Sequence, residues 1–105
     1  MATYIMLIKL TDQGASDIAH ATRGRNAGKK AAAAVGVQWK RSYLLIGAEY
    51  DVLVVAEAPD EETMARFALL GATSGAVTTR TMRAFTESEV DDLVESLPGL
   101  TELVA

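Results

Sequence analysis

His20 and the adjacent pair Tyr50 and Asp51 are the residues best suited to move protons. An imidazole titrates near neutral pH and can act as a general base, while a phenol or a carboxyl can pass the same proton on. We expect these three residues to be the catalytic groups if the protein is an enzyme. A purely structural role stays open for each: His20 as a plain helix residue, Asp51 bound to turn amides, and Tyr50 packed with its hydroxyl satisfied.

Metal chemistry is not expected from this sequence. His20 is the only histidine, so a multi-histidine site cannot form, and an axial haem ligand is the one remaining metal role for it. The chain has no cysteine, which excludes disulfides, thiolate metal sites, Fe–S clusters and cysteine nucleophiles. We therefore expect no metal and no cofactor.

A second group of residues is suited to bind a flat organic molecule. Alternation along a predicted strand puts Trp39, Arg41 and Tyr43 on one face, and Arg80 and Arg83 lie in a later strand. Aromatic rings stack on aromatic ligands, and guanidinium groups bind phenolates or carboxylates. The alternative is a packed aromatic strip with a cation–π contact.

Seven predicted elements in the order β-α-β-β-α-β-α carry these residues. β-branched and aromatic runs or period-two alternation indicate the strands, and capping residues and apolar spacing indicate the helices. We expect strands at residues 3–10, 37–46, 50–58 and 77–85, and helices from 11–12 toward 35, from 59–62 to about 71, and from 86 to 97. The first helix should bend at Thr22–Arg25, where Gly24 interrupts it, and end at Gly36.

The last helix has the clearest local signals. Thr86 and Glu89 form a capping-box pattern at its start, and Pro98-Gly99 ends it. Its apolar residues recur at the i, i+3, i+4 and i+7 positions of one helix face: Val90, Leu93, Val94 and Leu97.

The element order predicts one α+β domain over residues 1–105. Two β-α-β units joined by a hairpin form a four-stranded antiparallel sheet with its helices on one face. The other face would present residues such as Trp39, Tyr43, Thr79 or Met82 to water. Because that is a large apolar surface, we expect a second subunit to cover it.

The charge is acidic overall and unevenly placed. The formal net charge is −4, with six Arg/Lys and no acid in residues 18–48 and six acids and no base in residues 86–105. These segments are either solvated faces or complementary surfaces between subunits. An acidic total, the lack of an aromatic-rich RNA-binding strand and the lack of a spanning segment lead us to expect no nucleic-acid partner, no membrane and a cytoplasmic location.

Three segments in this order and spacing are similar to the GYD-domain family: residues 1–14 (MATYIMLIKLTDQG), 49–60 (EYDVLVVAEAPD) and 77–86 (VTTRTMRAFT). The resemblance spans nearly the whole chain. By this resemblance Tyr50 and Asp51 are the Tyr-Asp of the motif that names the family. The sequence departs at the glycine, since Ala48 stands two positions before Tyr50 and Gly47 one position earlier, which indicates a one-residue shift or a bulge in the turn.

The resemblance implies a dimeric α/β barrel, in which two ferredoxin-like subunits join their sheets. Relatives with this barrel include small-molecule monooxygenases, haem-degrading enzymes, polyketide cyclases, muconolactone isomerase and stress-response proteins. Because one fold hosts many functions, the family implies a fold and little chemistry.

Two functions from different classes stay open. The first is a homodimeric domain that binds a small organic, possibly aromatic, molecule between sheet and helices. If catalytic, it would be a cofactor-free monooxygenase, cyclase or isomerase. The second is a non-catalytic assembly or stress-associated oligomer, which the apolar tail from Leu97 to Ala105 and the opposite charges of the two segments suggest.

Overall fold

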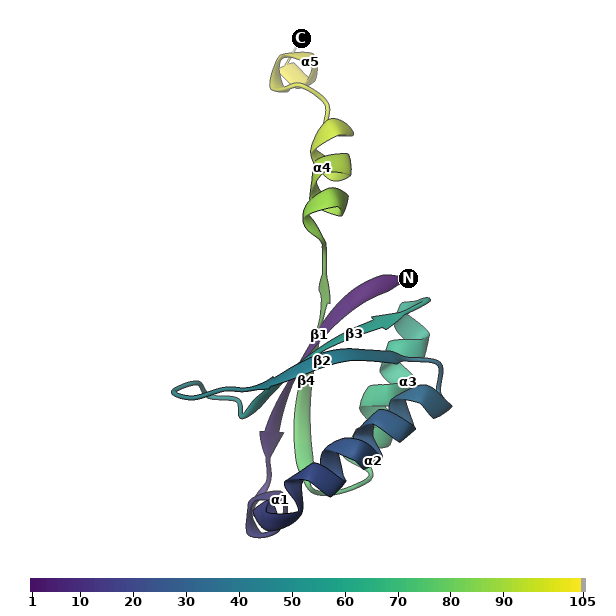
Figure 1. Cartoon of the computed structure of the whole chain (residues 1–105). Helices are drawn as coiled ribbons and strands as arrows, with labels where there is room; N and C mark the ends of the chain where they lie inside the picture. Colours follow the sequence, from purple (N-terminus) through teal and green to yellow (C-terminus); the bar gives the residue numbers. More distant parts are fainter. Residues whose placement is uncertain (105) are drawn as a thin grey trace.

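The computed structural model describes residues 1–104 of the chain, and residues 100 and 101 by their backbone alone. None of the helices in this described part is long and apolar enough to cross a membrane. The elements, labelled in Figure 1, are β1 (Ala2–Leu10), α1 (Asp12–Ser16), η1 (Ile18–His20), α2 (Ala21–Ala34), β2 (Gln38–Leu44), β3 (Val52–Ala58), α3 (Glu61–Ala72), β4 (Val77–Ala84), α4 (Glu87–Glu95) and α5 (Leu100–Val104).

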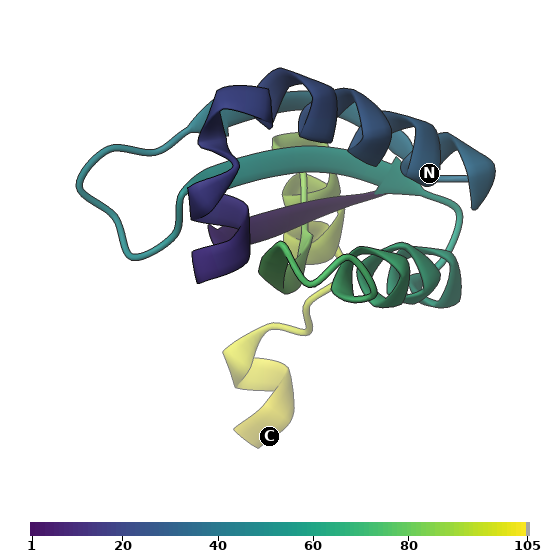
Figure 2. The ribbon, with the colours of Figure 1, turned by 90° about the horizontal axis from the view of Figure 1, so that it is seen from below.

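The four strands form one antiparallel sheet in the order β2-β3-β1-β4. The apolar strands β1 and β3 lie in the centre, and β2 and β4 are the edges. Helices α2 and α3 cover one face of the sheet, and Figure 2 shows both of them from the helix side. The predicted ferredoxin-like α+β fold is therefore confirmed.

The core lies between the central strands and the two covering helices, and it is small. Its largest fully buried side chains are Met64 of α3 and Val54 of β3, joined by Met6 and Phe67. Alternate residues of each central strand point into it, which is the period expected for a sheet with one covered face.

The first helical segment is broken at Asp17 and not at Thr22–Arg25, so that part of the sequence prediction is wrong. Gly24 continues α2 without interruption. The first turn is tied to the loop before β4, since the Thr11 backbone N–H donates to the Ala76 oxygen at 3.0 Å. This bond holds the start of α1 at that end of the sheet, and the chain passes through η1 before α2 runs over the strands.

A β-bulge at Lys40 corrects the predicted face of Trp39. Trp39 pairs with Ala56 but Arg41 pairs with Val55, so two residues of β2 are used for one step of β3. The extra residue reverses the alternation from that point on. Trp39 therefore points to the helix side, whereas Arg41 lies on the open face with Tyr43, which pairs with Leu53.

The face of the sheet opposite the helices is open and apolar at its centre. Tyr43 and Met82 lie on this open face and are 53% and 40% exposed. Thr79 pairs with Ile8 on the helix side, so it does not contribute, in contrast to the prediction. The centre of the open face is made of four half-buried residues of β1 and β3: Ile5, Leu7, Leu53 and Val55.

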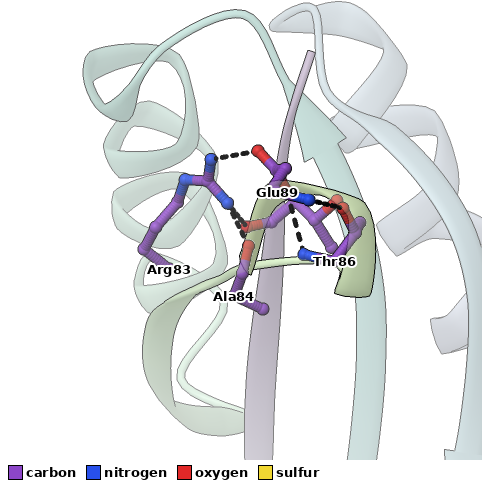
Figure 3. Close-up of polar contacts among 5 residues, drawn as sticks. Arg83, Ala84, Thr86 and Glu89 are labelled. Atoms are coloured by element: carbon purple, nitrogen blue, oxygen red, sulfur yellow. Dashed lines mark hydrogen bonds and ion pairs between the residues drawn. The ribbon is translucent and has the colours of Figure 1, made fainter. Parts of the chain in front are cut away.

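Helix α4 stands off the end of β4 and points away from the sheet (Figure 1). Its predicted capping box is present, because the Thr86 side chain accepts from the Glu89 backbone N–H and Glu89 accepts from the Thr86 backbone N–H. Glu89 also forms an ion pair of 2.9 Å with Arg83 of β4 (Figure 3). These contacts form a joint between strand and helix.

The joint favours the ionised carboxylate of Glu89. The Thr86 backbone N–H and then the Arg83 guanidinium lower the pKa of Glu89 to about 2. A carboxyl with a depressed pKa stabilises the fold above its unfolded-state pKa and loses that contribution as the pH falls through its folded-state value. The joint is therefore intact at neutral and mildly acidic pH.

Replacing Gly14 by alanine should destabilise the protein, since the new Cβ would lie 2.1 Å from the backbone oxygen of Ala76. Forcing these two segments apart should cost about 1–3 kcal/mol. Gly24→Ala is the matched control, because its Cβ meets nothing within 4 Å and it adds helix propensity, so it should stabilise by up to about 1 kcal/mol. Urea unfolding of both variants measures this, and equal stabilities would contradict it.

Candidate functional site

A cavity of about 600 Å³ lies between the sheet and the helices. Strands β1 and β3 supply apolar lining through Met6, Ile8 and Val52, and α3 closes one side with Phe67. Its size is within the usual range for a small-molecule site, and such sites are mostly apolar with a few polar groups. The cavity lies in the place that the sequence analysis proposed for a ligand.

The cavity exists because α2 turns small residues toward the sheet. A helix normally fills the space above a sheet with Leu, Ile or Phe side chains at core density. Here the lining residues that α2 contributes include only one large side chain, Arg25, and the others are glycine or alanine: Ala21, Gly24, Ala27, Gly28 and Ala31.

His20 lines the cavity and is held by Asp17, one turn earlier in the chain. The His20 Nδ1 lies 2.6 Å from the Asp17 Oδ1, and both residues line the cavity. A carboxylate only accepts hydrogen bonds, so Nδ1 carries the proton in this contact and the Nε2 lone pair is left free in the neutral ring. The side chains are 53% and 69% exposed, which puts the pair at the cavity mouth.

Asp51 lines the cavity at the strand ends and has a structural contact there. Its Oδ2 accepts a hydrogen bond from the Leu10 backbone N–H at 2.8 Å. Its own backbone N–H donates to the Ile8 oxygen, and its backbone oxygen accepts from Leu45, each at 2.8 Å. Asp51 therefore joins the end of β1 to the loop that enters β3, which is the structural role considered for it.

Trp39 is fixed in the cavity wall by close packing. A Cβ on Gly28 would lie 3.1 Å from the indole ring, so α2 approaches it closely only because that residue is glycine. Phe67 meets the indole edge-on, with ring centroids 6.4 Å apart. The Trp39 Nε1 is buried and finds no acceptor among the described residues, so packing alone positions the ring.

The structure does not bring the other predicted site residues to the cavity lining as a group. Tyr43 borders the cavity within the segment Ser42–Leu44, although its register puts it on the open face. Arg41 and Arg80 lie on the open face, exposed. Arg83 belongs to the joint with α4, and Tyr50 is half-buried in the loop before β3, outside the lining.

Asp17 is the site residue that sequence reasoning missed. Its signal was an Asp-x-x-His spacing, which places the two side chains on one face of a helical turn. In the described part of the chain, no group of three His, Cys, Asp or Glu side chains is close enough to hold a metal ion. The polar side chains that line the cavity include Asp17, His20 and Asp51, which are suited to hydrogen bonding and proton transfer.

The fold and the cavity together define a ferredoxin-like α+β domain with a cavity, open at its mouth, between its sheet and helices. The family model of the GYD domain matches residues 4–94, and the chain belongs to this family. A search of curated proteins found no match.

Removing the Asp51 carboxylate should cost stability. Asp51→Ala leaves the Leu10 N–H without its acceptor, and we expect a loss of about 1–3 kcal/mol. Asp51→Asn keeps an oxygen that can accept this bond, so it should lose clearly less. Denaturant unfolding of the two variants tests this, and a loss in Asn as large as in Ala would contradict the assigned contact.

Proposed function

We propose that this protein binds a small organic molecule in the cavity between sheet and helices, and that His20 accepts a proton from it. One observation carries the proposal: the imidazole, held by Asp17 through Nδ1, lines the same apolar cavity as the single tryptophan of the chain. A space this large in a small domain costs packing energy, which favours a use for it.

The arrangement supports a flat, mostly apolar ligand with one acidic hydrogen. Trp39 and Phe67 offer aromatic surface, while the polar groups gather toward one end, where Asp17, His20 and Asp51 line the cavity. A ligand that fills the cavity would displace water from around His20, which strengthens electrostatic interactions in its vicinity. Arg25 also lines the cavity and could neutralise a phenolate or enolate.

Proton transfer suits three reactions of the kind expected from the sequence. In an isomerisation, His20 Nε2 takes a proton from one ligand atom and returns it to another, so no co-reactant is needed. In a cyclisation, the same step forms an enolate that attacks a carbonyl carbon of the ligand, and the proton is returned to the new alkoxide. An oxygenation would start from the same anion and would also consume dioxygen.

The second part of the proposal is a homodimer formed through the open face of the sheet. Six apolar residues support it, since in a lone subunit they would meet water: Ile5, Leu7, Tyr43, Leu53, Val55 and Met82. A twin subunit packed sheet to sheet would bury them. The cytoplasmic location stays a prediction.

Small phenols, quinones and cyclic ketones should change the fluorescence of Trp39, which is the only tryptophan and lines the cavity. Ala27→Phe should abolish that change by filling the cavity from α2. Ala34→Phe is the matched control, because it adds the same ring to the same helix outside the cavity lining, so it should bind as the native chain does.

For a compound that binds and is converted, His20→Ala should lower kcat by about 10²–10⁴-fold, the usual contribution of a general base. Asp17→Asn should also lower kcat, with affinity nearly unchanged, because it removes the carboxylate that holds the proton on Nδ1 of the ring. Full turnover in His20→Ala would contradict the proton-transfer role.

For the binding experiment above, equal binding by Ala27→Phe and the native chain would contradict the cavity as the site.

Placing a charge on the open face should dissociate the dimer. Val55→Lys puts an ammonium at the centre of that face, and desolvating it in the interface would cost several kcal/mol. Ala65→Lys on the exposed side of α3 is the control and should stay dimeric. Sedimentation equilibrium gives the molar mass of each. A folded Val55→Lys chain that associates as tightly as the native chain, or a monomeric native chain, would contradict this interface.

A further inference from the structure

The helix α4 carries an apolar stripe that the subunit itself leaves exposed. Val90, Leu93 and Val94 of α4 and Leu97 in the turn that follows it are 43%, 49%, 60% and 67% exposed, although they recur at the spacing of one helix face. An isolated helix of this length is marginal in water, and most helical stability comes from packing such a face. The stripe therefore needs a surface to cover it.

The joint at the start of α4 opposes a return of this helix onto its own subunit. Only Phe85 and Thr86 separate β4 from α4. Arg83 fixes their direction, since it binds Glu89 and donates to the backbone oxygen of Ala84 (Figure 3). Its guanidinium carbon also lies 4.3 Å from the centroid of the Phe85 ring. Folding the helix back would break these contacts, so the cover must come from another molecule.

A shallow cleft of matching chemistry lies at the opposite edge of the sheet. It has a volume of about 520 Å³ between α2 and the start of β2, with Val37, Trp39 and Ala33 as apolar lining and Lys29 at its side. Its neighbour Lys30 is also exposed. Since β2 and β4 are opposite edges of the sheet, the helix that follows β4 starts far from this cleft in its own subunit.

We infer that α4 of one subunit docks in the α2–β2 cleft of a second copy of this chain. The apolar stripe would lie on Ala33 and Trp39, and the acids that flank it, Glu87 and Asp91, would face Lys29 and Lys30. The charges are complementary over a wider area, because residues 18–48 carry no acid and residues 86–105 carry no base. Two such contacts related by a two-fold axis close a dimer.

This inference shares the second copy with the proposed dimer but does not depend on ligand binding or on the open face. The chain has no cysteine, so a single introduced thiol reports on one position of α4. Val94→Cys lies in the stripe, and Ser88→Cys lies on the opposite side of the same helix. With the helix docked, a maleimide should label Cys at position 94 at least about tenfold more slowly than at 88, which corresponds to about 1.4 kcal/mol.

A charge exchange then identifies the partner surface. In the Val94→Cys chain, Glu87→Lys with Asp91→Lys should repel Lys29 and Lys30 and restore fast labelling. Co-refolding this chain with an excess of cysteine-free Lys29→Glu/Lys30→Glu chain should slow the labelling again, because the reversed charges meet between two molecules. The assay is run at low ionic strength, where exposed charges are least screened.

Three results would overturn the inference. Labelling at 94 as fast as at 88 in the otherwise native chain would show that the stripe is free. If the added Lys29→Glu/Lys30→Glu chain does not restore protection from the maleimide at position 94, α4 packs elsewhere or within its own subunit. The charge-reversed chain must show the native helix content by circular dichroism. If position 94 of such a folded chain is still protected from the maleimide, Lys29 and Lys30 are excluded as partners of α4.

Discussion

The structure depends on how little volume α2 contributes above the sheet. A four-stranded sheet needs its covered face filled by side chains of the helices that lie on it. Helix α3 does this with Met64 and Phe67, but the sheet-facing residues of α2 include Gly28, Ala31 and Ala32. The backbone of α2 therefore comes close to Trp39, and the space further along the helix stays open as the cavity. The same small residues of α2 also leave the domain with a thin core.

Much of this fold follows from local sequence patterns, because each helix start and each strand has its own signal. Thr11, Asp60 and Thr86 all cap helices with their side chains, and the alternation of β1 and β3 matches their buried faces. Two features were not predictable in this way. The bulge at Lys40 is defined only by the pairing of β2 with β3. The helix breaks at Asp17, whereas Gly24, the residue whose type signals a break, continues α2.

The candidate site, too, was predictable only where local sequence patterns define it. His20 was identified because of its chemistry, but its position at the cavity depends on η1, the turn that arises from the break. The aromatic and arginine group was predicted from period-two alternation, and one inserted residue separates Trp39 from Arg41. Arg83 has the charge of a ligand-binding residue, yet it pairs with Glu89, a capping acid five residues beyond the strand. Charge and spacing give candidates, and long-range pairing decides among them.

The open face of the sheet and the stripe of α4 are both apolar surfaces that the subunit itself leaves exposed to water. A domain of this size buries only about 60–65% of the surface of its unfolded chain, so apolar area that is left wet weighs heavily against its stability. Filling the cavity side with larger residues would help, but it would remove the space that we assign to the ligand. The remaining way to stabilise the subunit without closing that space is to cover apolar surface from outside. The cavity that permits ligand binding and the exposed apolar surface that favours association are then both consequences of the small residues on α2.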